Sequence, residues 1–450
     1  MSERRSLLGW LRGSAVYRSI FRAPPTTSPR GRAEASFGNV FLHLYPARVP
    51  RSLLSLKSTF RLGFIATVLF AVLLVTGVYL MFFYTPAVTM AYGDMQALRT
   101  QVGFGQLIRN VHRWSGHLMV LVVVLRLVRT FLDGAYKAPR EFNWVIGVGL
   151  LVVTLAYSFT GYLLPWDQLS YWAVRVGSDL VQYVPGIGRI LRDFLLGGRE
   201  IGQATLLRFY VLHVAVLTVA YFLLMAVHLW RVRKDGFALA PWRTGGAGGD
   251  AEAERRADET SSATGAREET ADEETAEAPT AEEPSASAGG RRVLGVVDGA
   301  LSRVRPRRPE DEVFSWPHLI VRHQVVALAT VALCIALGVA FEAPLREMAN
   351  PNHTPEPAKA PWYFVGLQEL LAHFDPLVAG VLAPSVLIGA LLILPYVDRH
   401  PERHPRSRRF ARALFHLVFG GLFVLTVIGA FFRGPGWAFV LPWEHLYFEP

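Results

Sequence analysis

Three histidines lie on stretches of this sequence that are typical of membrane helices. His112 follows a helix start near Ile108, and His213 and His228 follow a start near Leu206. Ionisable residues inside membrane helices indicate a functional site, although a single histidine can also bond a backbone carbonyl. The step from His213 to His228 corresponds to about 22 Å along a helix, on roughly one face. Imidazoles facing each other across a helical bundle are suitable axial ligands for haem iron, so this spacing predicts two stacked cofactor levels.

Two pairs of glycines repeat the same two-level pattern. Gly63 and Gly77 are separated by about four helical turns, as are Gly147 and Gly161, so each pair nearly shares a helix face. A flat macrocycle between helices needs positions without side chains, but close packing of small residues is a common alternative in membranes. We define an outer level as Gly77, His112, Gly161 and His213, and an inner level as Gly63, Gly147 and His228.

The inner level lacks a second histidine. The position that would match the outer pair, one glycine interval after His112, is Arg126. His117 cannot take its place, because five residues along a helix turn it about 140° away from His112. Arg126 could extend toward the membrane interface, or it could pair with a haem propionate or a quinone oxygen.

Seven apolar stretches are near the length that a helix needs to cross a bilayer. They lack Asp, Glu, Lys and Arg and are approximately 63–83, 114–125, 144–166, 209–230, 324–341, 376–397 and 413–432. The second is short because it ends at Arg126. The basic segment before the first has no apolar core with a small-residue cleavage site, so we expect no cleaved signal peptide. The sequence predicts an all-α, polytopic transmembrane protein with a four-helix haem-binding bundle and three further transmembrane helices.

Charge divides the chain into parts. Residues 250–283 carry thirteen acidic residues and three arginines, whereas the whole chain has a net charge of +10. A stretch of this composition is typical of a disordered linker. The predicted parts are a basic N-terminal cytoplasmic segment, a haem-binding four-helix domain, an acidic disordered linker and a three-helix C-terminal domain, at residues 1–58, 59–236, 237–312 and 313–450.

Basic residues also predict the orientation of the chain. With a cytoplasmic N-terminus, three groups of Lys and Arg fall in cytoplasmic positions, which satisfies the positive-inside rule. These groups lie at 126–140, 231–234 and 399–409. We therefore expect a multi-pass protein of the cell inner membrane with the long loops 84–107, 167–205 and 342–375 on the outer face. Cys334, the single cysteine, excludes an internal disulfide and a CxxCH haem attachment.

Four long strings of the sequence carry a resemblance to a known family. They start at Leu107, Gly161, Gly202 and Ala358, and they read LIRNVHRWSGHLMV, GYLLPWDQLSYWAV, GQATLLRFYVLH and AKAPWYFVGLQELLAHFDP. These strings cover both halves of the chain in order, and through them the chain resembles cytochrome b of the bc-type quinol:cytochrome c oxidoreductases. The spacing of His213 and His228 and the lack of an eighth helix are more similar to the plastoquinol-type pair of a b cytochrome and subunit IV, here fused through the linker.

The resemblance implies a subunit that oxidises quinol near the outer face, with two b haems, a Rieske iron-sulfur protein, a c-type cytochrome and a homodimeric complex in a lipid membrane. His112 and His213 match the ligands of the low-potential haem, and His228 matches one ligand of the high-potential haem, whose ligation is altered by Arg126. Arg61 stands where plastoquinol-type proteins have a haem-tethering cysteine, so no thioether-bound haem is expected. No nucleic-acid partner is expected.

The quinol-site loop departs from the family pattern. Family members often have a Pro-Glu-Trp-Tyr string whose glutamate accepts a quinol proton, whereas this chain has Pro361 before Trp362 and Tyr363. Glu369, about 1.7 turns beyond Tyr363, could enter the same pocket as proton acceptor, or it could be a surface residue or a helix cap. Tyr363 is a second candidate at the site, as pocket wall rather than chemistry. Near the outer level, cations could pair with haem propionates or serve surface positioning: Arg109, Arg113 and Arg208.

Two alternatives to a redox subunit remain open from the residues. One is a degenerate paralogue with one haem or none, which serves assembly or quinone binding, and Arg126 is the main argument for it. The other is a transporter that uses intramembrane histidines as a proton relay, which the length of the matching strings disfavours. The sequence does not distinguish between menaquinone, ubiquinone and plastoquinone.

Overall fold

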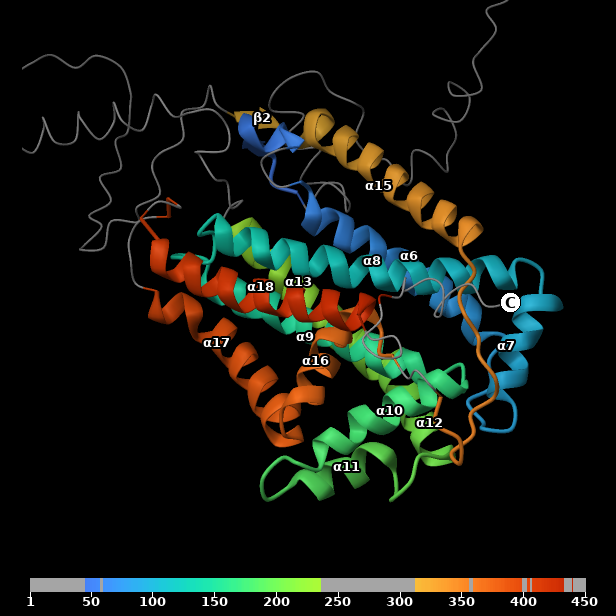
Figure 1. The fold of residues 1–450 in the computed structure, drawn as a ribbon. Coiled ribbons are helices and arrows are strands. Elements are labelled where there is room, and N and C mark those ends of the chain that lie inside the picture. Colours follow the sequence, from blue (N-terminus) through green and yellow to red (C-terminus); the bar gives the residue numbers. More distant parts are fainter. Residues whose placement is uncertain are drawn as a thin grey trace, which may run out of the picture.

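The computed structural model describes residues 45–56, 60–235, 312–355, 359–398, 403–404, 407–432 and 439. Within them the chain is mostly helical, and seven helical stretches are long and apolar enough to cross a membrane (Figure 1). The all-α polytopic fold predicted from the sequence is confirmed. The acidic linker and most of the N-terminal segment lie outside the described residues.

The spanning helices match the seven predicted apolar stretches, with one marked extension. They are α6 (Leu62–Met81), α8 (Gly105–Leu132), α9 (Glu141–Leu163), the α12 (Gln203–Val211), η2 (Leu212–Val216) and α13 (Leu217–Asp235) run, α15 (Ser315–Ala340), the η5 (Leu377–Leu382) and α17 (Ala383–Val397) run, and α18 (Arg409–Phe431). The second apolar stretch of the sequence is short because Arg126 ends it. The helix continues through Arg126 and Arg129 and reaches 28 residues.

The four N-terminal spanning stretches form a bundle around an apolar core. Buried residues from α6, α8, α9 and α13 meet there, including Phe70, Met119, Ile146 and Tyr221. The Phe70 and Tyr221 rings stack with their centroids 4.2 Å apart. Cys334 of α15 is fully buried against the same cluster, so it acts as a small apolar side chain.

Helices of the C-terminal half pack directly on this bundle. α15 packs on α6 and α8, and α17 packs on α9. Asn110 of α8 donates to the Gly338 carbonyl over 2.9 Å and accepts from the Ala343 amide over 2.8 Å. Trp144 of α9 donates to the Leu391 carbonyl over 2.6 Å. Buried hydrogen bonds of this kind fix the two halves in one register.

Shorter helices cover the end of the bundle that carries the long loops. They are α7 (Ala91–Thr100), α10 (Gln168–Val181), α11 (Gly188–Leu196) and α16 (Trp362–His373). Asp167 accepts a hydrogen bond from the Ser170 amide over 2.9 Å and so caps α10. In Figure 1, α10 and α11 lie together at the bottom of the view, beyond the ends of the spanning helices.

A two-stranded ribbon joins the segments that precede α6 and α15. β1 (Arg48–Pro50) pairs antiparallel with β2 (Glu312–Phe314), and η1 (Arg51–Leu54) follows β1. Beside the ribbon, the His323 ring stacks on Phe64 with centroids 4.1 Å apart. No pattern in the sequence predicts this ribbon.

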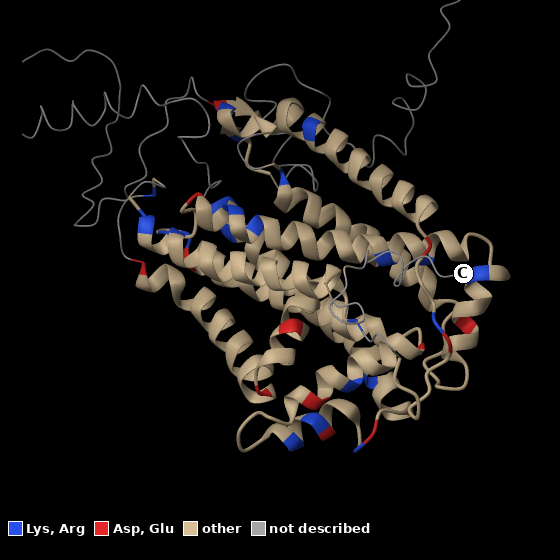
Figure 2. Cartoon of the chain, viewed as in Figure 1, with Lys and Arg blue, Asp and Glu red and all other residues tan. Residues whose placement is uncertain are grey.

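A polar cluster ties the two halves together at the end of the bundle where α8 ends and α18 begins. Asp398, just after α17, accepts hydrogen bonds from Tyr136 and, over 2.8 Å, from Lys137. Arg408 donates to the Tyr136 hydroxyl over 2.6 Å. Burial raises the pKa of Asp398, but the hydrogen bonds from Lys137 and Tyr136 outweigh burial, so the pKa lies below its ordinary value. Figure 2 shows Lys and Arg gathered at this end of the bundle.

Candidate haem and quinol site

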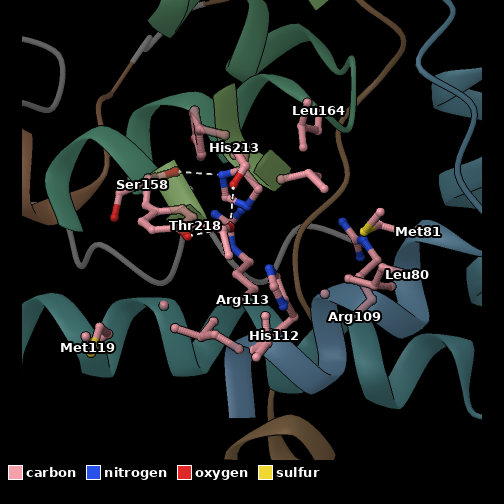
Figure 3. Close-up of a pocket in the computed structure, with 18 of the residues that line it drawn as sticks. Leu80, Met81, Arg109, His112, Arg113, Met119, Ser158, Leu164, His213 and Thr218 are labelled. Atoms are coloured by element: carbon pink, nitrogen blue, oxygen red, sulfur yellow. Dashed lines mark hydrogen bonds between the residues drawn. The ribbon is translucent and has the colours of Figure 1, made fainter. Parts of the chain in front are cut away.

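A cavity of about 290 Å³ lies inside the N-terminal bundle, at the outer level. Its walls come from α6, α8, α9 and the α12–α13 stretch, and His112 and His213 line it from opposite sides (Figure 3). The centroids of the two imidazole rings are 6.4 Å apart, and their planes are inclined by 65°. The structure thus brings together the two histidines that the sequence paired.

This separation suits two ligands of one metal ion. An imidazole nitrogen binds a metal at about 2.0 Å, and the ring centre lies roughly 1 Å behind that nitrogen. Two axial imidazoles on one iron therefore have ring centres roughly 6 Å apart. The observed spacing of 6.4 Å meets this requirement.

Hydrogen bonds made by the Nδ1 atoms fix the orientation and the tautomer of both rings. The Thr76 hydroxyl donates to the Val72 carbonyl over 2.7 Å, so it accepts from Nδ1 of His112 over 2.8 Å. Nδ1 of His213 donates to the Tyr157 carbonyl over 3.1 Å. With the proton on Nδ1, each ring keeps the lone pair of Nε2 for a metal. The donor set therefore fits a haem iron with two axial histidines.

Glycines make room for these rings. A side chain at Gly161 would place its Cβ 2.5 Å from Cε1 of His213, and one at Gly77 would lie 3.3 Å from Cε1 of His112. The space at these two glycines is used by the imidazoles themselves. Both glycines line the cavity, as the outer level predicts.

The helix that carries His213 contains a π-turn. Residues Leu212–Val216 form this turn between α12 and α13, and a π-turn adds one residue to a helical turn. The step from His213 to His228 is therefore one residue longer than the glycine intervals, although it spans the same levels. The apolar pattern of the sequence predicts a regular α-helix here and does not mark the π-turn.

The three arginines expected near the outer level have different positions. Arg113 lines the cavity and lies over the Tyr162 ring, 5.5 Å from its centroid. Arg109 also borders the cavity, but it donates to the carbonyls of Ala343 and Pro344 over 2.6 and 2.7 Å. Arg109 therefore fastens the loop after α15 to the bundle.

Arg208 is not brought to the cavity. It is exposed, and its guanidinium bonds the Phe194 carbonyl and lies 5.5 Å from the centroid of that ring. The expectation of a propionate partner at Arg208 is therefore wrong, and the alternative of a surface position fits. The cause is that α12 turns this side chain toward α11.

The inner level is arranged differently from the outer one. Arg126 donates to Nε2 of His228 over 2.6 Å. A Cβ at Gly63 would overlap the Arg126 guanidinium, whereas a Cβ at Gly147 would meet nothing within 4 Å. The guanidinium thus takes the space beside Gly63 and the lone pair of His228. These residues do not fit a second haem with two axial histidines.

The quinol-site loop reaches the outer cavity through α16. Tyr363 lines the cavity, and the neighbouring Trp362 donates to Nδ1 of His117 over 3.1 Å. Glu369 does not line the cavity. It is 3% exposed, its Oε1 lies 3.1 Å from Nε2 of His373, and its Oε2 faces Gly429 on α18. α16 directs this side chain toward α18 and not into the cavity, and its role as proton acceptor stays a prediction.

His117 lines the cavity, although helical periodicity excludes it as the second haem ligand because it points away from His112. That same angle directs it toward α16, where its ring centroid is 5.7 Å from that of Tyr363. The sequence therefore held a signal for a separate role of His117 on the other face of α8.

Two family models match successive parts of the chain. Residues 50–236 match the family model described as Cytochrome b/b6/petB, and residues 348–448 match the model described as Cytochrome b(C-terminal)/b6/petD. The first match contains the histidines of both levels. The second contains the quinol-site loop and the last two spanning stretches.

Individual relatives give the same assignment. The chain is 45% identical over 177 residues to cytochrome b6 of Prochlorococcus marinus strain AS9601, covering 39% of this chain and 81% of the relative. It is 46% identical over 179 residues to cytochrome b6 of strain MIT 9211, with the same coverage. A chain of a hyperthermophilic respiratory Complex III shares the fold, with a TM-score of 0.64 and 21% identity over 96% of this chain and 93% of that one. The chain belongs to the cytochrome b/b6 family as a multi-pass redox subunit of the b-haem type, with its b6-like and C-terminal parts joined in one polypeptide.

Proposed function

We propose that this chain is the quinol-oxidising subunit of a bc-type quinol:cytochrome c oxidoreductase and contributes to proton translocation. The observation that carries the proposal is the facing pair His112 and His213, with both Nε2 lone pairs available, in the same cavity as Tyr363. A redox cofactor and an organic substrate site that share one cavity suit electron transfer between them.

We propose that the outer level holds one haem b and the inner level holds none. His112 and His213 would hold its iron, and Arg113, directly after His112, is a cation of the same cavity wall. When bound, haem b supplies one-electron redox chemistry in a site without covalent catalysis. The contact between Arg126 and His228 supports the absence of a haem at the inner level. The guanidinium of Arg126 donates to Nε2 of His228, so this nitrogen has no lone pair left for iron.

Proton release from quinol needs a route to the surface. Glu369 is buried and bonded to His373, whose side chain is 46% exposed. We propose that this pair accepts protons near α16 and passes them outward, with Glu369 as the buried acceptor. Tyr363, about 1.7 turns before Glu369 on the same helix, is the residue of α16 that lines the cavity.

The partners follow from the proposed reaction. A one-electron acceptor such as a Rieske iron-sulfur protein and a c-type cytochrome would receive electrons on the side of the long loops, within a homodimeric complex. The basic end of the bundle supports an orientation with this end in the cytoplasm and the long loops on the outer face of the cell inner membrane.

The first experiment measures the haem spectrum of the purified complex and the rate at which quinol reduces the haem. Reduced-minus-oxidised spectra should show a low-spin b-type haem, and quinol should reduce it. His213→Ala should abolish both signals, whereas His416→Ala, on the exposed face of α18, should change neither. A wild-type complex without a reducible haem would refute the redox function and favour an assembly or quinone-binding role.

A further inference from the structure

His117 joins the two halves of the chain at the edge of the cavity. It lies on α8, in the N-terminal bundle, and it contacts Trp362 and Tyr363 on α16, in the C-terminal half. Trp114, one turn earlier on α8, lies 5.4 Å from His117 between ring centroids. The imidazole thus contacts three aromatic side chains.

The bond to Trp362 fixes which nitrogen of His117 carries a proton. An indole N–H is a donor and never an acceptor. Nδ1 of His117 must therefore accept this bond with its lone pair, at 3.1 Å. In the neutral ring the proton is then on Nε2, which becomes a donor.

This tautomer is opposite to that of the two haem-ligand candidates. His112 and His213 carry the proton on Nδ1 and offer a lone pair at Nε2. His117 offers an N–H at Nε2 and is unsuited to bind a metal there. Among the described residues no protein group bonds Nε2 of His117, and the residue lines the cavity. This donor is therefore available to a ligand in the cavity.

The chemistry of the cavity wall restricts that ligand. None of the described residues that line the cavity is an aspartate or a glutamate, and Arg113 adds a second donor on the same helix. A ligand with exposed oxygens, held among apolar and aromatic side chains, suits such a wall. The carbonyl or hydroxyl oxygen of a quinone head group has this character.

We infer that Nε2–H of His117 donates a hydrogen bond to an oxygen of the quinone head group, and that Trp362 is a positioning residue that fixes the donor tautomer. The inference rests on the proposed quinol oxidation. It assigns His117 to substrate binding rather than to proton acceptance, because the lone pair that could take a proton is engaged by Trp362.

Infrared difference spectroscopy of the complex, with quinone labelled with ¹³C at one carbonyl, tests the bond directly. A hydrogen bond lowers the carbonyl stretching frequency, so the wild-type complex should show a downshifted band. His117→Ala should return the band toward its unbonded position and raise the KM for quinol about tenfold, as expected for one lost buried hydrogen bond. His117→Gln, which keeps a donor, should restore most of the shift. Trp362→Phe should weaken it while the haem spectrum stays unchanged.

Three outcomes would overturn the inference. One is an unshifted band in the wild-type complex, and another is an unchanged band and KM in His117→Ala. The third is a changed haem potential in His117→Ala without quinone present, which would assign the donor to a haem propionate. Failure of the proposed function is distinguishable, because the wild-type complex would then not oxidise quinol at all. The matched control is His416→Ala, a histidine on a spanning helix outside the cavity.

Discussion

Arg126 donates a hydrogen bond to Nε2 of His228 over 2.6 Å, so the nitrogen that would bind iron at the inner level is engaged by a cation. At the outer level the rings of His112 and His213 line one cavity, and the hydrogen bonds of their Nδ1 atoms leave the equivalent nitrogens with a lone pair. One helical bundle thus contains a ligand pair suited to a metal and, about four turns away, a pair that excludes one.

Haem stoichiometry tests this difference. The purified wild-type protein should contain one haem b per chain, measured by pyridine haemochrome absorbance against protein concentration. Arg126→His should raise the ratio to two, because the new imidazole replaces the guanidinium beside Gly63 and frees the lone pair of His228. Arg126→Lys is the control and should keep the ratio at one. Two haems per chain in the wild type would contradict the one-haem proposal.

Thr76 should set how tightly the outer haem is held. Its hydroxyl accepts a hydrogen bond from Nδ1 of His112. Loss of a hydrogen bond to a metal-binding histidine typically lowers metal affinity 10–100-fold, so Thr76→Val should speed haem loss by about tenfold or more. Haem transfer to apomyoglobin measures the rate. Thr154→Val is a matched control, because Thr154 also lines the cavity but bonds only the Leu150 carbonyl of its own helix. Equal loss rates in the two variants would remove Thr76 from this role.

Gly161 should tolerate no side chain. Gly161→Ala would place a Cβ 2.5 Å from Cε1 of His213, so the ring must shift away from the cavity. We expect loss of the low-spin haem spectrum, or a high-spin spectrum from a single axial ligand. Gly389→Ala on α17, where a Cβ meets nothing within 4 Å, should leave the spectrum unchanged. A low-spin spectrum of normal amplitude in Gly161→Ala would contradict the proposed ligation.

Glu369 should affect the rate of quinol oxidation without affecting the haem. Glu369→Gln keeps the shape of the side chain but removes the proton acceptor, and positioned acid-base groups typically contribute 10²–10⁴-fold, so the rate should fall by about a hundredfold. The rate of haem reduction after mixing with quinol measures the effect. Asp94→Asn, on α7 away from α16, serves as a control. An unchanged rate in Glu369→Gln would exclude the role.

The Asp398 cluster should make stability dependent on acid pH. The pKa of Asp398 is lower in the folded state than in the unfolded chain, so its contribution is complete above about pH 4 and is lost as the pH falls through the lowered value. Asp398→Asn should remove this dependence. It should also lower the stability near neutral pH by about 1–3 kcal/mol, because Lys137 loses its partner. Thermal unfolding in detergent from pH 3 to 7 measures both effects. A parallel pH profile in Asp398→Asn would exclude Asp398 as the cause.

The sequence predicted the seven spanning stretches and the pairing of His112 with His213, because both depend on local patterns. Apolar length determines a membrane span, and helical periodicity determines which residues share a level. Arg126 was also identified correctly as the anomaly of the inner level, since its position follows from the same periodicity.

Features that depend on contacts between distant segments were not predicted. β1 and β2 are separated by about 260 residues along the chain, and each is too short for an alternation of apolar residues to be visible. Glu369 and Arg208 were misplaced because the rotation of α16 and α12 is set by the helices against which they pack. The π-turn at His213 has no composition that marks it.

The β1–β2 ribbon has a consequence for how the two halves find each other. It holds the start of α15 beside the start of α6, so the alignment of the halves is encoded in strand pairing and in helix contacts. The peptide connection between Asp235 and Glu312 then acts through local concentration, by keeping two partners within reach of each other. Separate polypeptides that end and begin in this segment, produced together, should assemble into the same architecture, with a dependence on expression level that the single chain lacks.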